Sequence, residues 1–280
     1  MIIKSYSKIN LSLSVNEKSN NKRKLHDIQS HFCLINLFDT IEIKKIKDRK
    51  DNIKFQGKFS RYIKEKKNSV HKALSILRKR NLISSFYSVK ITKKIPVFGG
   101  LGGGTSNAFY ITKFLTKKRL KGELLNIFVK NIGSDIRIFL NKQGFLNSLE
   151  STVNFPTQYK LIFLLIYPNI NCSTKYVYSK IRKYSLKSRQ NLKKIRSNKK
   201  FVKFLSAKKN DLQSVVENKY PLIRQLIKEI SKKKGCYFSR MTGSGSVCYG
   251  VFKSDKSAKV ALKEIKLKHP NYWLSIAKTI

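Results

Sequence analysis

The amino-acid sequence predicts an α+β fold, in which strands and helices do not alternate strictly. Three observations support this prediction. A strand pattern precedes, and a helix pattern follows, a glycine-rich run at residues 99–104. A second glycine turn at 241–246 leads into an apolar strand. The pattern of apolar and polar residues changes after Gly144. We therefore expect two domains, residues 1–150 and 151–280, in a chain long enough to bury a core.

The first part of the chain has the pattern of strands, one helix and a further strand. Alternating apolar and polar residues indicate strands, whereas Val70, Ala73, Leu74 and Leu77 share one face of a helix. The expected elements are a strand over Ile2–Val15, a polar turn at 16–25, two strands within His31–Lys45 bent near Asp39, a helix over Ser69–Arg80 and a strand over Tyr87–Lys93.

The later part of the chain mixes helices with apolar strands. Ser106 or Asn107 is suited to cap a helix that follows the glycine run. The expected elements are helices over Ser106–Leu120 and Glu123–Asn131, a strand over Tyr159–Tyr167, a lysine-rich, helical and solvent-facing tract at 179–209, a helix over Asn210–Ser231, a strand over Val247–Phe252, a helix over Ser257–Leu267 and a short terminal strand.

The charge of the chain is extreme. Its 61 Lys and Arg residues against 15 Asp and Glu give a formal net charge of +46, which is typical of a nucleic-acid binder. The basic residues, however, run through the whole length and accompany abundant Asn, Ile, Phe and Tyr. These residue types have AT-rich codons, so mutational pressure in an AT-rich bacterial genome explains the composition without a function, and a polyanionic partner is the alternative.

Cysteine spacing and hydropathy indicate a cytoplasmic protein without a membrane segment. The four cysteines are widely spaced and form no CxxC or Cys/His zinc pattern, so we expect reduced thiols. The N-terminus lacks an apolar signal region, and no segment approaches eighteen uninterrupted apolar residues.

The glycine-rich run has the features of a phosphate-binding loop. Missing Cβ atoms allow backbone amides to approach an oxyanion, and a following helix N-terminus favours negative charge. The run is not a Walker A loop, because Thr105 rather than Lys follows Gly104. Thr105 also stands where a dinucleotide fingerprint or protein-kinase loop starting at Gly100 needs glycine. A flexible turn is the alternative.

Several ordered segments resemble the galactokinase, homoserine, mevalonate and phosphomevalonate (GHMP) kinase superfamily. Within it they are most similar to the 4-diphosphocytidyl-2-C-methyl-D-erythritol kinase family. The matching segments are Ser7-Lys-Ile-Asn-Leu-Ser-Leu13, His26, Asp39, Asn68, Gly99–Ala108, Gly133-Ser-Asp135, Asn210-Asp-Leu212 and Arg240-Met-Thr-Gly-Ser-Gly245. The departures are Lys24-Leu25 in place of Gly-Tyr, Arg137 in place of proline, and a shortened stretch at 145–150.

The resemblance implies a two-domain GHMP kinase architecture. Its N-terminal, ATP-binding domain would be ribosomal-protein-S5-like and its C-terminal domain ferredoxin-like. The implied activity is ATP-dependent phosphorylation of the C2 hydroxyl of 4-diphosphocytidyl-2-C-methyl-D-erythritol in non-mevalonate isoprenoid synthesis, with Mg²⁺ as cofactor. The partners would be small molecules, namely ATP and a cytidine diphosphate sugar alcohol, and the chain a monomer or homodimer.

Two charged residues would carry the catalysis. Lys8 lies in an apolar strand, where an unpaired ammonium is costly, so it requires an anionic neighbour. The resemblance makes Asp135 that neighbour; it would orient or deprotonate the substrate hydroxyl while Lys8 stabilises the developing alkoxide. The alternatives are one more lysine among many for Lys8 and a helix N-cap for Asp135.

The resemblance also assigns the residues that bind ATP. Asn68 would contact the adenine side, with a helix cap as its alternative role. A hydroxyl of Thr105 or Ser106 would contact phosphate or Mg²⁺, with helix capping as the alternative for Ser106. The expected ATP-binding residues are Gly99, Gly100, Leu101, Gly102, Gly103, Gly104, Thr105, Ser106 and Asn68, and Ser106 is the candidate Mg²⁺ ligand.

A third group of residues would bind the second substrate. His26 would contact cytosine and Tyr178 would stack on it; the alternatives are a loop histidine and a core tyrosine. The second glycine turn would pack against the substrate and the first loop, or be a simple turn. The expected substrate-binding residues are Asn10, His26, Tyr178, Thr242, Gly243, Ser244 and Gly245.

Three other functions stay open at this point. One is that of another GHMP kinase, of homoserine or mevalonate type. The presence of His26 and of Asn210-Asp-Leu212 argues against it. A basic nucleic-acid-binding protein would need basic residues clustered on one face with interleaved aromatics, a pattern the sequence does not show. A decayed enzyme is suggested by the departures at Leu25 and after Gly144.

Overall fold

The computed structural model describes residues 1–17, 26–63, 68–117, 120–188 and 195–280. Contacts within these ranges group into two units, whose residues interleave along the chain. The first unit comprises Met1–Lys8, Asn36–Val97 and Gly102–Lys142, and the second Ile9–Ile35, Phe98–Leu101 and Gln143–Ile280. The domain boundary near residue 150 stays a prediction. None of the helices in the described ranges has both the length and the apolar character that a membrane span requires.

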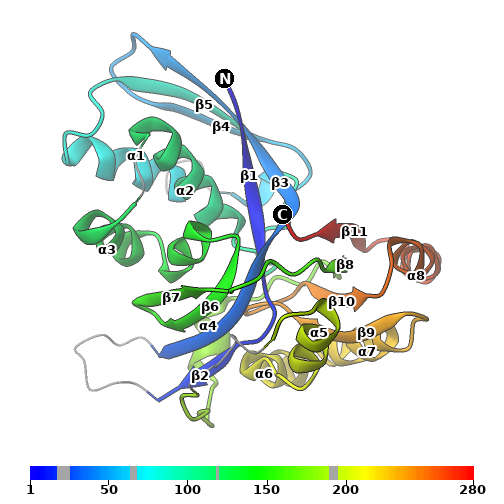
Figure 1. Cartoon of the computed structure of the whole chain (residues 1–280). Coiled ribbons are helices and arrows are strands. Elements are labelled where there is room, and N and C mark those ends of the chain that lie inside the picture. Colours follow the sequence, from blue (N-terminus) through cyan, green and yellow to red (C-terminus); the bar gives the residue numbers. More distant parts are fainter. Residues whose placement is uncertain (18–25, 64–67, 118–119, 189–194) are drawn as a thin grey trace. The chain divides into compact units, whose positions relative to one another are not determined.

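The first unit combines a sheet with three α-helices. Strand β5 lies between the second half of β3, to which it is antiparallel, and β4, to which it is parallel. Figure 1 shows the helices together to one side of these strands. The elements are β1 (Ile2–Asn10, through Lys8), β3 (Asp27–Ile46, from Asn36), β4 (Asn52–Gln56), η1 (Ser60–Tyr62), α1 (Ser69–Lys79), β5 (Phe86–Thr92), α2 (Gly103–Thr116), α3 (Gly122–Asn131) and η2 (Ser134–Leu140).

The second unit contains a four-stranded antiparallel sheet in the order β11-β8-β10-β9. The first half of β3 pairs with β2 and β6, and β6 pairs with β7. The elements are β2 (Ser14–Asn16), β6 (Gln143–Ser148), β7 (Ser151–Asn154), β8 (Ile162–Tyr167), α4 (Thr174–Ser179), α5 (Asn198–Ser206), α6 (Asp211–Lys219), α7 (Pro221–Ser231), β9 (Cys236–Met241), β10 (Cys248–Phe252), α8 (Asp255–Lys268) and β11 (Trp273–Lys278).

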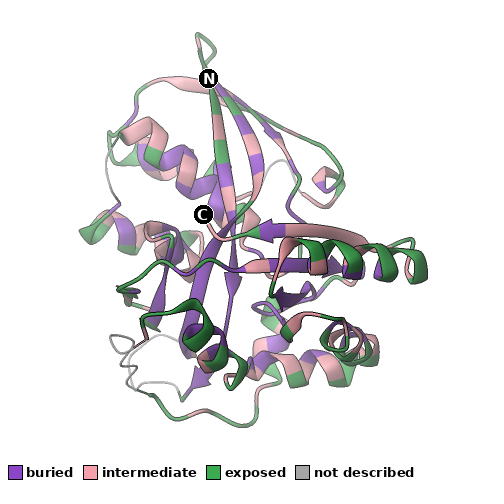
Figure 2. Ribbon diagram, turned by 45° about the vertical axis from the view of Figure 1, so that its right-hand side comes forward, coloured by how far each residue is buried: buried purple, intermediate pink, exposed green. Residues whose placement is uncertain are grey.

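Burial follows the apolar pattern of the sequence. In α1 the four residues expected on one face, Val70, Ala73, Leu74 and Leu77, are the buried ones. Figure 2 shows buried residues along the strands, whereas exposed residues follow the outer face of helices such as α8. Since full burial of such a side chain stabilises a fold by about 1.5–3 kcal/mol, these faces hold the helices in place.

The prediction of two strands bent near Asp39 is wrong, because β3 is one continuous strand. Its residues Ser30–Cys33 pair with β6, and Thr40–Ile46 pair with β5. Asp39, near which the bend was expected, carries a carboxylate, a group that is rarely buried in a strand. The structure buries it completely, and its carboxylate accepts backbone amide protons from Lys94 and Ile95.

The prediction of a helical, solvent-facing tract at 179–209 is wrong in part. Residues 180–188 form no helix, residues 189–194 lie outside the described ranges, and only α5 is helical. Phe201, Val202 and Leu205 of α5 are buried. The helical part of the prediction is confirmed for α5, which the Ser197 side chain caps, but the buried face of this helix contradicts the expected solvent-facing tract.

The predicted helix over Asn210–Ser231 is two helices. The chain leaves the helical conformation at Tyr220, and α7 begins at Pro221. Proline lacks the amide proton that a helix interior needs but fits the first helical position, so it ends one helix and starts the next.

Candidate functional site

The catalytic pair expected from the sequence forms an ion pair in the first unit. The Lys8 Nζ atom lies 3.3 Å from Oδ2 of Asp135. The lysine side chain is 3% exposed, whereas the aspartate side chain is 32% exposed. A buried ammonium thus faces a carboxylate that solvent, and therefore a substrate, can reach.

Local geometry places the two partners. Lys8 lies on β1, and Asp135 is the second residue of η2, which follows Gly133. Gly133 has a φ of 145°, in the region that favours glycine. No side chain caps the start of η2, so the alternative role of Asp135 as an N-cap is wrong. Its carboxylate is directed to the ion pair instead.

The glycine-rich run enters helix α2 beside Lys8. Gly102 is the residue before the helix and has a φ of 70°. A Cβ atom on Gly102 would lie 3.2 Å from Cε and Cγ of Lys8, so only glycine lets the loop backbone approach the lysine this closely. The amides of Gly103, Gly104 and Thr105 open the helix and have no acceptor within it. These free donors and the helix dipole suit an anion.

The prediction that Ser106 or Asn107 caps α2 is wrong, because the helix begins at Gly103. Glycine has a low helix propensity, and Gly103 and Gly104 were therefore expected in the loop. In the first turn of α2 they carry no side chains, so the backbone amides of this turn stay accessible. Ser106 is fully buried, its hydroxyl donates to the Tyr6 carbonyl at 2.5 Å, and its Oγ lies 2.7 Å from Oγ of Ser5. The hydroxyl is therefore committed to β1 and is poorly placed to be the expected Mg²⁺ ligand.

The earlier part of the glycine run belongs to the second unit and meets the second glycine turn there. A Cβ atom on Gly100 would lie 2.2 Å from the Thr242 carbonyl oxygen. The amides of Ser246 and Val247 donate to the carbonyls of Phe98 and Gly99, at 3.1 and 3.2 Å. The expected packing of the second turn against the first loop is confirmed.

The second turn is fixed further by two asparagines. The backbone amide of Asn10 donates to Oγ1 of Thr242 at 3.0 Å. The Asn210 side chain donates to the carbonyls of Met241 and Gly243, at 2.9 and 2.8 Å. Thr242, Gly243, Ser244 and Gly245 are all buried, so their backbone rather than exposed side chains defines this surface.

His26 and Tyr178, expected to bind cytosine, lie together in the second unit. Their rings are stacked, with centroids 6.1 Å apart and an interplanar angle of 17°. Tyr184 was not among the predicted site residues, although its ring centroid lies 5.5 Å from that of His26. It stands in the lysine-rich tract, where only the fold reveals the contact. Leu25 lies outside the described residues.

Asn68, expected on the adenine side, caps α1. Its Oδ1 atom accepts the amide protons of Val70 and His71, both at 3.0 Å. The structural alternative is therefore confirmed, and an additional contact with adenine stays a prediction.

His31 of β3 is a buried histidine that contacts the chain just after Asn10. His31 Nδ1 lies 2.7 Å from Oγ of Ser12, and the ring packs against Phe145 at a centroid distance of 4.6 Å. Burial, aided by the charges of Lys208 and Arg240, lowers the pKa of His31 from 6.5 to about 3. The ring is therefore neutral in the folded protein.

The four cysteines are free thiols. Burial raises the pKa of Cys172 and of Cys236 to about 11 and raises the pKa values of Cys33 and Cys248 further. Thiols of this kind are weak nucleophiles, so nothing in their surroundings indicates cysteine chemistry.

A hollow of about 1000 Å³ in the second unit is lined by residues 180–185, by one side of α6 and by Arg240. None of the residues predicted to bind ATP or substrate lines it. Tyr184 is one of the residues that line this hollow, and its ring also contacts that of His26.

Within the described ranges, no three His, Cys, Asp or Glu side chains gather in a way that could hold a metal ion. Single oxygen donors are present in the first unit, in the carboxylate of Asp135 and the hydroxyl of the half-buried Thr105. This sparse donor set fits Mg²⁺, which keeps several waters and takes further oxygens from substrate phosphates.

Comparison with known proteins yields consistent relatives. The GHMP kinases C terminal family matches residues 189–271. The chain is 36% identical to 4-diphosphocytidyl-2-C-methyl-D-erythritol kinase of Pelagibacter ubique (strain HTCC1062), over 99% of this chain and 98% of that protein. It is 30% identical to the enzyme of the same name from Wolbachia pipientis wMel, over 97% and 96%.

Solved structures agree with these sequences. A crystal structure of 4-(cytidine 5'-diphospho)-2C-methyl-D-erythritol kinase matches with a TM-score of 0.76 at 18% identity and covers 99% of both chains. A homoserine kinase from Cytophaga hutchinsonii matches with a TM-score of 0.70 at 15% identity, over 100% of this chain and 94% of that one. These likenesses confirm the expected α+β architecture.

Proposed function

Because the chain belongs to the 4-diphosphocytidyl-2-C-methyl-D-erythritol kinase family of the GHMP kinases, we propose that Lys8 and Asp135 carry its phosphoryl transfer. The protein is an ATP-dependent kinase that phosphorylates the C2 hydroxyl of 4-diphosphocytidyl-2-C-methyl-D-erythritol in the non-mevalonate route to isoprenoids. The observation that supports this residue assignment is the 3.3 Å ion pair of a buried ammonium with an accessible carboxylate, next to Gly102.

In the proposed mechanism Asp135 accepts a hydrogen bond from the C2 hydroxyl and takes its proton as the oxygen attacks the γ-phosphorus of ATP. The bond between the γ-phosphorus and the β,γ-bridging oxygen breaks, and ADP leaves with that oxygen. Lys8 stabilises the negative charge that develops on that oxygen. Because the lysine stem packs against Gly102, its charge is held at the start of the phosphate loop without reorganisation.

The glycine run would bind the ATP phosphates. Gly103, Gly104 and Thr105 supply the amides of the α2 N-terminus that have no acceptor within the helix. The residues before them, Gly99 to Gly102, are proposed to complete the loop around the phosphates. When bound, Mg²⁺ neutralises phosphate charge, and Thr105 rather than Ser106 would contribute a hydroxyl. Asn68 holds α1 and is proposed to lie beside adenine.

The second unit would recognise the cytidylyl end of the substrate. His26 offers a hydrogen-bonding ring, and Tyr178 and Tyr184 offer aromatic faces on which a base can stack. Tyr184 would compensate for the absence of tyrosine at position 25. Asn10 and the turn at 242–245 form a rigid backbone surface, which we assign to the same substrate.

The test is ADP release with 4-diphosphocytidyl-2-C-methyl-D-erythritol, homoserine and mevalonate as separate acceptors. We expect turnover with the cytidylyl substrate alone. Comparable kcat/KM with homoserine or mevalonate would contradict the assignment of His26, Tyr178 and Tyr184. Tight, salt-sensitive RNA binding without ADP release would instead support a nucleic-acid-binding protein.

A further inference from the structure

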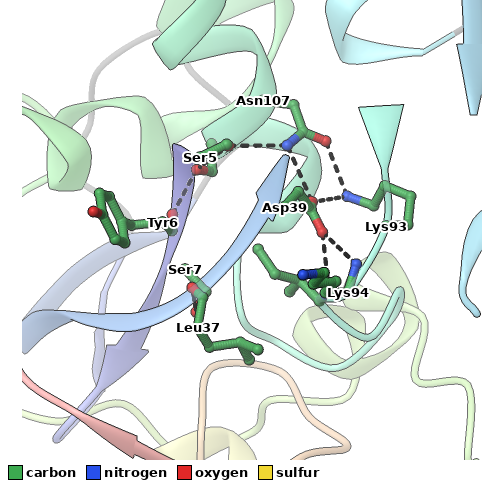
Figure 3. Close-up of polar contacts among 10 residues, drawn as sticks. Ser5, Tyr6, Ser7, Leu37, Asp39, Lys93, Lys94 and Asn107 are labelled. Carbon is green, nitrogen blue, oxygen red and sulfur yellow. Dashed lines mark hydrogen bonds and ion pairs between the residues drawn. The ribbon is translucent and has the colours of Figure 1, made fainter. Parts of the chain in front are cut away.

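A buried carboxylate in the first unit holds the chain just before the glycine run. Asp39 of β3 is fully buried. Its Oδ1 atom accepts the amide protons of Lys94 at 2.7 Å and Ile95 at 2.9 Å (Figure 3). These two residues follow strand β5 and precede the glycines, so one oxygen fixes the point at which the run leaves the sheet.

The other oxygen of Asp39 reaches the helix that follows the run. Asp39 Oδ2 accepts a hydrogen bond from Nδ2 of Asn107 at 3.1 Å and forms an ion pair with the ammonium of Lys93. Lys93 also donates to Oδ1 of Asn107 at 2.9 Å. A Cβ atom on Gly103 would lie 3.4 Å from this ammonium, which therefore stands at the first turn of α2.

The contacts continue from Asn107 to β1. Its side-chain amide also donates to Oγ of Ser5 at 2.9 Å, and that oxygen lies 2.7 Å from Oγ of Ser106 (Figure 3). Ser106 in turn donates to the Tyr6 carbonyl. A chain of hydrogen bonds thus connects Asp39 with α2 and with the strand that carries Lys8.

A buried ion pair adds little net stability to a fold, because the cost of desolvating both charges offsets their attraction. Apolar residues of similar volume often stabilise a protein equally well or better, because both charges must be taken out of water. Asp39 and Lys93 have side chains exposed by 0% and 1%. An apolar pair at these positions, however, could not accept the two loop amides.

We propose that Asp39 is a positioning residue for ATP binding: it fixes the chain on both sides of the glycine run, before it through Lys94 and Ile95 and after it through Asn107, a contact that the Lys93 ammonium bridges. The inference rests on the proposed phosphate-binding role of the run. Loss of this anchor leaves the amides of the α2 N-terminus free to shift relative to the preceding strand. ATP binding then weakens, whereas binding of the second substrate is unaffected.

The matched control is Asp51, another buried carboxylate of the first unit. Its side chain is 6% exposed, forms two 3.0 Å hydrogen bonds with Arg78 and accepts the Tyr87 amide proton at 2.9 Å. Asp51 therefore has an ion pair and an amide contact like those of Asp39, but at the opposite end of β5 from the glycine run.

The experiment compares Asp39→Asn with Asp51→Asn in the full chain, measuring KM for ATP, KM for the cytidylyl substrate, kcat and thermal unfolding. Asparagine has one carbonyl oxygen and one NH2 group, so the group that replaces one of the two carboxylate oxygens can no longer accept hydrogen bonds, and the loop amides and Lys93 cannot both be served. We expect Asp39→Asn to raise the KM for ATP at least about tenfold, as for the loss of one charge-assisted hydrogen bond. The cytidylyl KM should stay within about twofold.

Asp51→Asn should lower the Tm without changing the KM for ATP. The double variant Asp39→Leu/Lys93→Met removes both buried charges; it should unfold at a higher temperature than Asp39→Asn and still bind ATP weakly. An ATP KM close to that of the parent protein in either Asp39 variant would overturn the proposal. So would an equal rise in KM from Asp51→Asn.

A further variant separates this inference from the role of the run itself. If Gly103→Val weakens ATP binding while folded Asp39 variants do not, the positioning role fails and the phosphate loop stands. If neither change affects ATP, the assignment of the glycine run fails as well.

Discussion

Replacing Asp135 with Asn, or Lys8 with Ala, is expected to reduce kcat by on the order of 10²-fold or more. The separation of 3.3 Å between the two charges corresponds to about 5 kcal/mol at an effective dielectric constant of 20. Asp135 is one-third exposed, and solvent reduces that figure. A 10²-fold effect requires about 2.7 kcal/mol, which lies well within it.

The double variant carries the sharper expectation. If both residues act on one proton and one developing charge, removing the second partner costs little once the first is gone. The kcat of the double variant of Lys8 and Asp135 should therefore be less than about tenfold below that of the less active single variant. Independent roles predict instead a combined loss of kcat on the order of 10⁴-fold.

The assay is ADP release at saturating ATP and cytidylyl substrate, with circular dichroism and thermal unfolding as checks of folding. Lys4→Ala is the matched control, because Lys4 is an exposed lysine of the same strand, with its ammonium over the Phe38 ring. It should leave kcat within about twofold, as most surface substitutions do. Full additivity of the Lys8 and Asp135 losses would refute the joint role.

Three further changes have defined outcomes. Gly103→Val should raise the KM for ATP or abolish activity, because its Cβ would lie 3.1 Å from the Ile95 side chain and branch where phosphate approaches; unchanged ATP binding in the folded variant would contradict this. Replacing the exposed Lys199, Lys200 and Lys203 by Gln should leave kcat intact, with at most a modest rise in KM at low salt; a large loss of kcat at high salt would place α5 in the site. Stability should fall with acidification between pH 6.5 and about 3, by up to about 1.4 kcal/mol per pH unit, because the unfolded chain protonates His31 and the folded chain does not. Urea titrations of His31→Gln should lack this contribution, and an identical pH dependence would refute it.

The ion pair of Lys8 and Asp135 could be predicted from the sequence because the need of Lys8 for an anionic partner is visible in its own strand. A lysine within an apolar strand needs a carboxylate, and Asp135 was the acidic residue that the family resemblance offered. Helix α1 could also be predicted from the sequence, since its cap Asn68 and its buried face lie within one short segment. In these places local propensity and tertiary packing favour the same structure.

Other features depend on partners far away in the chain. Asp39 resembles a bend residue until the amides of Lys94 and Ile95 are brought to it. The start of α2 at Gly103 contradicts glycine's low helix propensity, and the side chains of Ser106 and Asn107 in this helix hydrogen-bond with β1. Tyr184 meets His26 only in the folded chain. Strand pairing and burial decided each of these cases, and neither is encoded locally.

The interleaved order of the two units sets the order of events on the ribosome. Every residue of the first unit has been synthesised by Lys142, whereas residues 9–35 of the second unit need Gln143–Ile280 to complete it. At about 5–20 residues per second, the rest of the chain takes about 7–28 s to follow. During that interval the nascent polypeptide exposes apolar segments such as Leu11, Leu13 and Phe32, which become fully or nearly fully buried later. Slow translation therefore lengthens the period in which these apolar segments lack the residues that later bury them.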